Sequence, residues 1–235
     1  MNQKILVVET NVANFAGTTH LTGLWLGESA EFVSVMEQAG FDIDYVSPNG
    51  GYVPLDPRSM KDTYVDEVTL KTYLKHDYQV RGLAQTLTPA QISPEDYDAI
   101  YFTGGHGVMF DFPDNQDLQK LTVAIYENGG YLCSVCHGIA GLLNVKLDNG
   151  NYLIDGKKVT GFTTSEELLS GNSKRVPFLN EKVATSHGAE FVKERPFKSF
   201  VVQDKQLITG QNPESPKAVA EQLLKNLTAD VAGSN

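Results

Sequence analysis

The chain contains two cysteines, Cys133 and Cys136, and His137 follows the second directly. A C-x-x-C-H sequence fits four chemistries: attachment of a c-type haem, a thioredoxin-like redox pair, part of a zinc site, or nucleophilic catalysis. Haem attachment belongs to exported proteins, and the first ten residues hold an apolar run of only four, too short for the core of an export signal. A zinc site usually needs four ligands, and the sequence has no second cysteine pair.

The local pattern separates the redox interpretation from the nucleophile interpretation. Residues 131–135 form an apolar run typical of a buried strand, so Cys133 lies inside a predicted strand. A redox pair opens a helix instead, and Cys133 and Cys136 would point to opposite faces of the strand, which is poor geometry for a disulfide. A nucleophile elbow, in which a buried strand turns sharply into a helix and presents one side chain, fits Cys136 better. An inert buried cysteine in a core strand is the alternative.

In an elbow, Cys136 would lie at the N-terminus of a helix. Free backbone N–H groups and the helix dipole favour a thiolate there, which predicts a thiol pKa below about 8.5. His137 would be the neighbouring base, so the two side chains would supply the nucleophile and the proton acceptor of covalent catalysis.

A glycine-rich turn, Gly104-Gly105-His106-Gly107, follows a predicted strand at 99–103. Glycines allow backbone N–H groups to approach a ligand and to act as an oxyanion hole. In an open α/β sheet, this turn and the elbow both lie at the carboxyl ends of strands, where ligands bind. His106 itself is equally well explained as a turn histidine with no chemical role.

Two positions could supply an acid to the site. Glu28 lies in the apolar start of a predicted helix, and Glu166 or Glu167 follows the run Gly161-Phe162-Thr163. A glutamate among Trp and Leu residues either points to solvent or is buried with a raised pKa. The helical periodicity favours the solvated position for Glu28.

The elements that must position these residues begin with a β-α-β series. Apolar runs at 5–8 and 41–46 predict strands, and the spacing of apolar residues over 24–39 predicts a helix between them, which implies a right-handed parallel crossover. Further expected elements are strands at 99–103 and 131–135, helices at 114–126, 137–143, 166–169 and 215–227, and hairpins at 152–160 and 200–209.

A long polar segment, residues 47–93, interrupts the pattern and predicts a small cap insertion. The sequence therefore predicts one α/β domain over residues 1–228 with a doubly wound, mostly parallel sheet sandwiched by helices. Residues 229–235 are small and polar, and we expect them to form a flexible tail.

Composition limits the partners. The 235 residues include 19 Lys and Arg against 29 Asp and Glu, a formal net charge of −10. This excess of acidic groups disfavours binding to the phosphates of nucleic acid or to an anionic membrane. No stretch approaches the roughly 18 uninterrupted apolar residues that a spanning helix needs. We therefore expect a soluble, cytoplasmic protein that binds neither nucleic acid nor membranes.

Five runs together carry a resemblance to a known family: FTGGHG at 102–107, VCHG at 135–138, GFTTSEE at 161–167, VPFLNE at 176–181 and LITGQNPES at 207–215. Because these runs occur together and in this order, the chain resembles the ThiJ/PfpI superfamily. Within it, the chain is similar to the branch of heat-shock chaperones and glyoxalase III enzymes. The resemblance implies a flavodoxin-like fold of the class I glutamine amidotransferase type. It also matches segment 47–93 with the cap elements of that branch.

The resemblance implies a Cys-His-Glu site. Cys136 would be the nucleophile, His137 its neighbour, and Glu167 the carboxylate that orients the histidine. The resemblance also makes Glu28 an acid hydrogen-bonded to the thiol, against the solvated position that periodicity favours.

Further implications concern the oxyanion hole, cofactors and assembly. The backbone N–H groups of Gly105 and His106 would form the oxyanion hole, no metal or other cofactor would be needed, and a homodimer is expected. Two positions depart from the family pattern: Ile139 stands where proline is common, and Cys133 stands where a small residue is common. Neither departure removes a catalytic group.

The activity expected from this resemblance is the cofactor-independent conversion of a small 2-oxoaldehyde such as methylglyoxal to a 2-hydroxy acid, lactate in that case. The reaction would pass through a hemithioacetal on Cys136. Two alternatives stay open. The same nucleophile could hydrolyse glycated adducts or peptides, or the protein could be a stress-holding chaperone or a redox sensor in which Cys136 is oxidised to a sulfinate.

Overall fold

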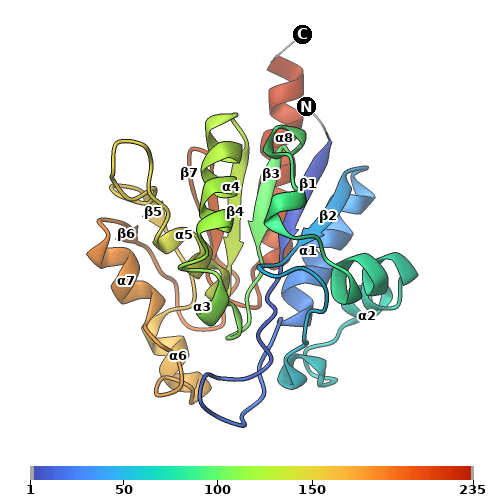
Figure 1. The fold of residues 1–235 in the computed structure, drawn as a ribbon, viewed down its shortest axis with the longest axis vertical. Helices are drawn as coiled ribbons and strands as arrows, with labels where there is room; N and C mark the ends of the chain where they lie inside the picture. The colour runs from blue at the N-terminus through green and yellow to red at the C-terminus, as the bar shows by residue number, and fades with distance from the viewer. Residues whose placement is uncertain (1–2, 234–235) are drawn as a thin grey trace.

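A six-stranded sheet forms the centre of the computed structural model, which describes residues 3–233. The sheet order is β2-β1-β3-β4-β8-β7 (Figure 1). The strands are β1 (Lys4–Val8), β2 (Asp42–Val46), β3 (Ala99–Phe102), β4 (Tyr131–Val135), β7 (Val201–Asp204) and β8 (Leu207–Gly210). Every pairing is parallel except that of the edge strand β7 with β8. Because the order 2-1-3-4 is that of flavodoxin-like doubly wound sheets, the predicted fold class is confirmed.

Helices cover both faces of this sheet (Figure 1). One face packs against α1 (Leu26–Gln38) and α8 (Pro216–Gly233), and the other against α4 (Gln116–Glu127) and α5 (Ala140–Leu143). Alternate residues of β1 enter the two cores: Ile5 belongs to the first, and Leu6 to the second. Both faces of β1 are therefore buried, which explains why its sequence is continuously apolar rather than alternating.

The parallel strands end at the edge of the sheet opposite the two chain termini (Figure 1). Between β1 and β3 the chain changes direction across the sheet, and in this fold class such a switch point opens a crevice beyond the strand ends. The short elements after the strands belong to this edge: α3 (Val108–Asp111), the 3₁₀ turn η5 (Cys136–Ile139), α6 (Thr164–Ser170) and α7 (Asn180–Ser186).

Segment 47–93 contributes several short elements of its own. They are the 3₁₀ turn η1 (Pro57–Met60), α2 (Glu67–Tyr73), the π-helical turn η2 (Tyr78–Ala84) and the 3₁₀ turn η3 (Pro89–Gln91), and a further turn η4 (Pro94–Asp96) leads into β3. Bridges from Leu55 to Leu24 and from Leu87 to Val46 tie the segment to the start of α1 and the end of β2. Within residues 3–233, no helix is both long and apolar enough to cross a bilayer.

Two sequence predictions about local elements differ from the structure. The hairpin at 152–160 is wrong, because β5 (Lys158–Val159) pairs in parallel with β6 (Glu190–Phe191), and Tyr152 instead bridges Lys146. The final helix does not end at residue 227 but continues to Gly233, into the expected tail, of which residues 234 and 235 lie outside the described chain. The hairpin at 200–209 is confirmed by the antiparallel pair β7–β8.

A buried carboxyl group lies directly after β1. Glu9 has no exposed surface, and its Oε1 atom accepts a 2.6 Å hydrogen bond from Ser29, whose hydroxyl accepts a bond from Tyr78. Burial raises the pKa of Glu9 to about 8, although the Ser29 hydrogen bond counteracts part of the effect. Glu9 is therefore a group that holds its proton in the folded protein at pH values where the unfolded chain has lost it.

We expect Glu9→Gln to flatten the dependence of stability on pH. Because the folded pKa is raised, the stability that Glu9 contributes is complete below pH 4.5 and is lost as the pH rises toward 8, at up to about 1.4 kcal/mol per pH unit. Urea unfolding at pH 5, 6, 7 and 8 measures this. The free energy of unfolding of Glu9→Gln should rise relative to that of the wild type as the pH rises. That of the surface variant Glu127→Gln should change with pH as the wild type does. Parallel curves for Glu9→Gln and the wild type would contradict the prediction.

Candidate active site

Cys136 occupies a sharp turn between strand and helix. β4 ends at Val135, and Cys136 opens η5 with a φ of 57°, a left-handed conformation that is unusual for a residue with a side chain. The carbonyl of Cys136 accepts a 3.0 Å hydrogen bond from the N–H of Phe162. Gly138 lets the turn lie against β3, since a Cβ at this position would be 2.3 Å from the carbonyl oxygen of Phe102. The elbow predicted from the sequence is confirmed as a backbone feature.

A histidine and a glutamate line up behind the thiol. The Sγ atom of Cys136 lies 3.3 Å from Nδ1 of His137, and Nε2 of His137 lies 2.8 Å from Oε2 of Glu167. All three side chains are buried. Glu167 comes from the first turn of α6, where Thr163 caps the helix. The structure thus brings the three predicted residues into one hydrogen-bonded row.

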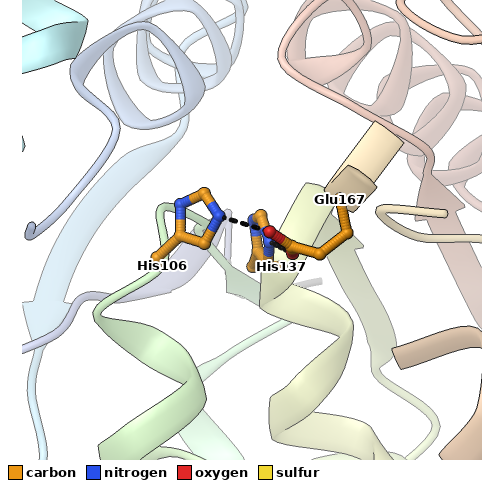
Figure 2. A group of neighbouring side chains, drawn as sticks. All are labelled: His106, His137 and Glu167. Atoms are coloured by element: carbon orange, nitrogen blue, oxygen red, sulfur yellow. Dashed lines mark hydrogen bonds and ion pairs between the residues drawn. The ribbon is translucent and has the colours of Figure 1, made fainter. Parts of the chain in front are cut away.

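Glu167 pairs with two neighbouring histidines, His106 and His137, which Figure 2 draws together with it. Its Oε1 atom pairs with Nε2 of His106 at 3.0 Å and also accepts a 2.9 Å hydrogen bond from the hydroxyl of Ser170. Burial alone would raise the pKa of Glu167, but the hydrogen bonds from His106 and His137 hold it well below its usual range. Burial, and secondarily His137, lowers the pKa of His106 to about 4. The cluster therefore contains a carboxylate and a neutral His106 imidazole.

Glu28 is buried beside the thiol. The Cys136 thiol and the Gly104 N–H both approach its carboxyl group, and burial raises its pKa well above the usual value. Within the described chain, neither carboxyl oxygen has a partner that completes hydrogen-bond geometry. The solvated position that periodicity favours is wrong, because the first turn of α1 is buried on all sides from Leu26 to Ala30. The position beside the thiol that the family resemblance implies is confirmed, whereas the hydrogen bond to the thiol stays a prediction.

The pKa of the Cys136 thiol is raised, not lowered as the elbow predicts. Burial, reinforced by the neighbouring Glu28, raises its pKa, whereas the elbow alone predicts a lowered value. The helix that follows consists of one 3₁₀ turn and the four-residue α5, so its dipole is short and does not outweigh the carboxyl. Cys133, in β4, is fully buried, and both cysteines are free thiols.

The glycine-rich turn presents two backbone N–H groups beside the elbow. Gly105 has a φ of 98°, and a Cβ there would lie 2.2 Å from the carbonyl oxygen of Gly23 and 2.7 Å from the nitrogen of Trp25, so only glycine fits. Within residues 3–233, no acceptor pairs with the N–H of Gly105 or of His106. Unpaired backbone N–H groups are what an oxyanion hole requires, and Gly105 and His106 both line the cavity beside the thiol.

A cavity of about 400 Å³ opens over these groups. Its lining includes Cys136, Glu28, Trp25 and Phe162, and also Gly105 and His106 of the glycine-rich turn. Arg58, Lys61 and Tyr64 reach the cavity from segment 47–93. The predicted cap insertion therefore contributes part of the wall.

The side chains of His106, His137 and Glu167 could also be read as metal ligands, because their donor atoms all lie within 4.8 Å of one another. Two histidines and a carboxylate are a common ligand set. Here, however, the Nε2 atoms of both histidines already hydrogen-bond to Glu167. A metal would have to displace both protons, so the arrangement fits a proton network better than a metal centre.

Sequence reasoning missed two side chains of the site. Arg58 contacts the His106 ring, although 48 residues separate them, and nothing in its polar loop marks it as a functional residue. The sequence predicts only a turn position or a backbone donor at His106, yet its imidazole pairs with Glu167. Local sequence patterns could not reveal either side chain, because each reaches the site through contacts between residues far apart in the chain.

Fold and site together define a flavodoxin-like α/β protein with a cysteine on a strand-to-helix elbow, a histidine beside it and a carboxylate behind the histidine. Residues 26–226 match the DJ-1/PfpI family, and the chain belongs to this family.

Relatives of known name cover most of the chain. The glutathione-independent glyoxalase HSP31 of Saccharomyces cerevisiae is 33% identical over 210 residues, which cover 85% of this chain and 86% of the relative. Glyoxalase 3 of Candida albicans is 31% identical over 210 residues, which cover 86% of this chain and 89% of the relative.

Solved structures agree with this comparison. The crystal structure of glyoxalase III from Candida albicans superimposes with a TM-score of 0.84 at 28% identity and covers 94% of this chain and 96% of its own. The 24 kDa rapid encystment protein of Francisella tularensis gives a TM-score of 0.90 at 33% identity, with coverage of 95% and 98%.

We expect Gly105→Ala to damage the site beyond the cost of its backbone strain. Gly150 offers a matched control, since it too has a positive φ, of 82°, but a Cβ there meets nothing within 4 Å. Gly150→Ala should cost about 1–2 kcal/mol of unfolding free energy through strain alone. Gly105→Ala should cost more and should lower the rate at which Cys136 is alkylated, because the turn must move away from Gly23. Equal losses in the two variants would contradict this reading of the turn.

Proposed function

We propose that the protein is a glutathione-independent glyoxalase of the glyoxalase III type, which converts methylglyoxal or related 2-oxoaldehydes to 2-hydroxy acids. The observation that carries the proposal is Cys136 on its elbow, 3.3 Å from Nδ1 of His137, in the lining of a cavity that Gly105 and His106 also line. The names of relatives at about 30% identity support the same chemistry. No cofactor enters the proposed reaction.

The first step is addition of the Cys136 thiol to the aldehyde carbon. His137 accepts the thiol proton at Nδ1, and the new C–S bond forms as the carbonyl π electrons move to oxygen. The N–H groups of Gly105 and His106 stabilise the oxyanion, which takes up a proton to give a hemithioacetal. Glu167 stabilises the imidazolium of His137 during this transfer.

The second stage moves a hydrogen within the substrate. His137 removes the C1 proton of the hemithioacetal to form an enediol, and the proton returns at C2. Glu28, which burial keeps protonated, is placed beside the sulfur to exchange a proton with the substrate oxygens. The resulting 2-hydroxy thioester is hydrolysed by water, which releases the acid and regenerates the thiol. C1 is oxidised and C2 is reduced, so no external oxidant is needed.

The size of the cavity favours a second candidate that uses the same residues. A volume of about 400 Å³ lies within the range of pockets that hold drug-sized ligands, and methylglyoxal fills only a small part of it. A methylglyoxal adduct carried on an amine or a peptide would use more of the space. Hydrolysis of such an adduct, as a deglycase or amidase, needs the same nucleophile and oxyanion hole.

Lactate formation from methylglyoxal, without glutathione or added metal, tests the proposal. Cys136→Ala should abolish it, by a factor of at least about 10³, because the nucleophile is lost. Cys133→Ala is the matched control, since this thiol lies in the strand below and should leave the rate within about twofold. Loss in both variants, or in neither, would contradict the assignment.

A second arm of the same experiment offers a preformed adduct of methylglyoxal with a lysine peptide, freed of residual aldehyde. Faster turnover of the adduct than of methylglyoxal would favour the deglycase candidate. Lactate from free methylglyoxal alone would favour the glyoxalase.

We also infer a homodimer from the resemblance to this family, and we propose the cytoplasmic location that the sequence pattern predicts. The mass of one chain is 25.7 kDa, so light scattering after size exclusion should give about twice this value. A monomeric mass at all concentrations would contradict the inference.

A further inference from the structure

Arg58 enters the active site from segment 47–93, and no step of the proposed reaction uses it. Its Nη2 atom lies 3.2 Å from Nδ1 of His106. Asp56 accepts hydrogen bonds from Nε and Nη2 of the same guanidinium, a bidentate arrangement that fixes an arginine in one orientation. Asp56 is itself fully buried, and its backbone N–H donates a 2.8 Å hydrogen bond to the carbonyl of Leu24. A buried clamp therefore holds Arg58 against the imidazole.

This contact determines where the imidazole proton lies. A guanidinium has only donors, so Nδ1 of His106 must accept and the ring proton must lie on Nε2. That Nε2–H donates to Oε1 of Glu167 at 3.0 Å, and Oε2 of Glu167 accepts from Nε2–H of His137 at 2.8 Å. His137 is left with a bare Nδ1, which lies 3.3 Å from the sulfur of Cys136. Arg58 fixes the acceptor at Nδ1 of His106, and the Glu167 carboxylate, which can only accept, fixes both Nε2–H groups as donors, so together the two residues set the direction of each hydrogen bond as far as the thiol.

Burial is the main reason why His106 stays neutral; the neighbouring His137 and Arg58 act in the same direction, and the carboxylate of Glu167 acts against them. Arg58 of η1, His137 of η5 and Glu167 of α6 are the titratable groups that face it, and the ring of Phe15 packs against it with centroids 5.3 Å apart. The desolvated ring and the adjacent cation oppose a second proton. While His106 stays neutral, the negative charge of Glu167 is left for His137 when that residue accepts the thiol proton.

We propose that Arg58 is a positioning residue of the active site that keeps His106 in its Nε2–H form. His106 in turn holds the carboxylate that orients His137. Without the guanidinium, His106 can move its proton to Nδ1, which removes its hydrogen bond to Glu167, or gain a second proton, in which case it competes with His137 for the charge of Glu167. The kinetic consequence rests on the proposed function, whereas the position of the imidazole proton does not.

Long-range ¹H–¹⁵N NMR of the histidine rings tests the first part directly. The wild type should show His106 as the Nε2–H tautomer, Arg58→Ala should show a mixture of the two neutral tautomers at pH 6, and Arg58→Lys should keep the wild-type pattern. Arg81→Ala is the matched control, because Arg81 also pairs with an aspartate, Asp77, but on the surface. An unchanged His106 tautomer in Arg58→Ala would overturn the proposal.

Kinetics test the second part. In Arg58→Ala we expect kcat for 2-oxoaldehyde turnover to fall at least about tenfold with KM changed less than threefold, and the acidic limb of the pH profile to move up by roughly one pH unit. Arg58→Lys should restore most of kcat, since an ammonium also donates to Nδ1. A change confined to KM would show that Arg58 binds substrate instead, and it would overturn the positioning role.

Two safeguards keep the test decisive. Removing Arg58 leaves Asp56 as a buried unpaired charge, so the double variant Asp56→Asn/Arg58→Ala is measured as well and should share the altered tautomer. The rate at which Cys136 is alkylated by iodoacetamide, followed against pH, reports on the same network without any substrate. If the wild type makes no lactate, the proposed function fails, but the NMR and alkylation results still decide the role of Arg58.

Discussion

The buried carboxylate of Glu167 hydrogen-bonds to two neighbouring imidazoles, and the geometry of the site depends on this one charge. A buried carboxylate is stable only when its lone pairs are occupied. Here His106, His137 and Ser170 occupy them. The same hydrogen bonds fix the two rings, because each ring can satisfy the carboxylate only with Nε2 turned toward it. The hydrogen bonds that stabilise the buried charge of Glu167 are therefore the same ones that orient the two histidine rings.

The glutamate next to it has a different task. Glu166 is also buried, but its carboxyl group faces away from the site and accepts hydrogen bonds from Gln211 and Asn212 after β8, and from the backbone N–H of Thr163. It anchors the first turn of α6 to the end of the sheet. Because α6 is fixed in this way, the following residue, Glu167, is held over the elbow of the neighbouring strand β4 without support from a long helix.

Features set by residues close together in the chain were predictable from the sequence, and features set by contacts between distant residues were not. Strands such as β1 and β4 were predictable because burial on both faces leaves a continuous apolar run, and the elbow at Cys136 was predictable from the strand that ends before it. Glu28 was misplaced because periodicity assumes one solvated face, which the start of α1 lacks. The hairpin at 152–160 failed because β5 pairs with a strand about thirty residues later. Arg58 gave no signal, since its partner is close only in the folded chain.

The reactivity of Cys136 depends on a second buried carboxyl group rather than on the elbow alone. Burial raises the pKa of both Cys136 and Glu28, and two negative charges side by side in this environment would repel strongly. The pair therefore carries at most one negative charge. A thiolate is accessible only while Glu28 is protonated, when the neutral carboxyl can donate to sulfur and the imidazolium of His137 can balance the charge. The dipole of the short helix after Cys136 is too weak to stabilise the thiolate in place of the proton on Glu28. The reactivity of the thiol therefore depends on Cys136, Glu28 and His137 together.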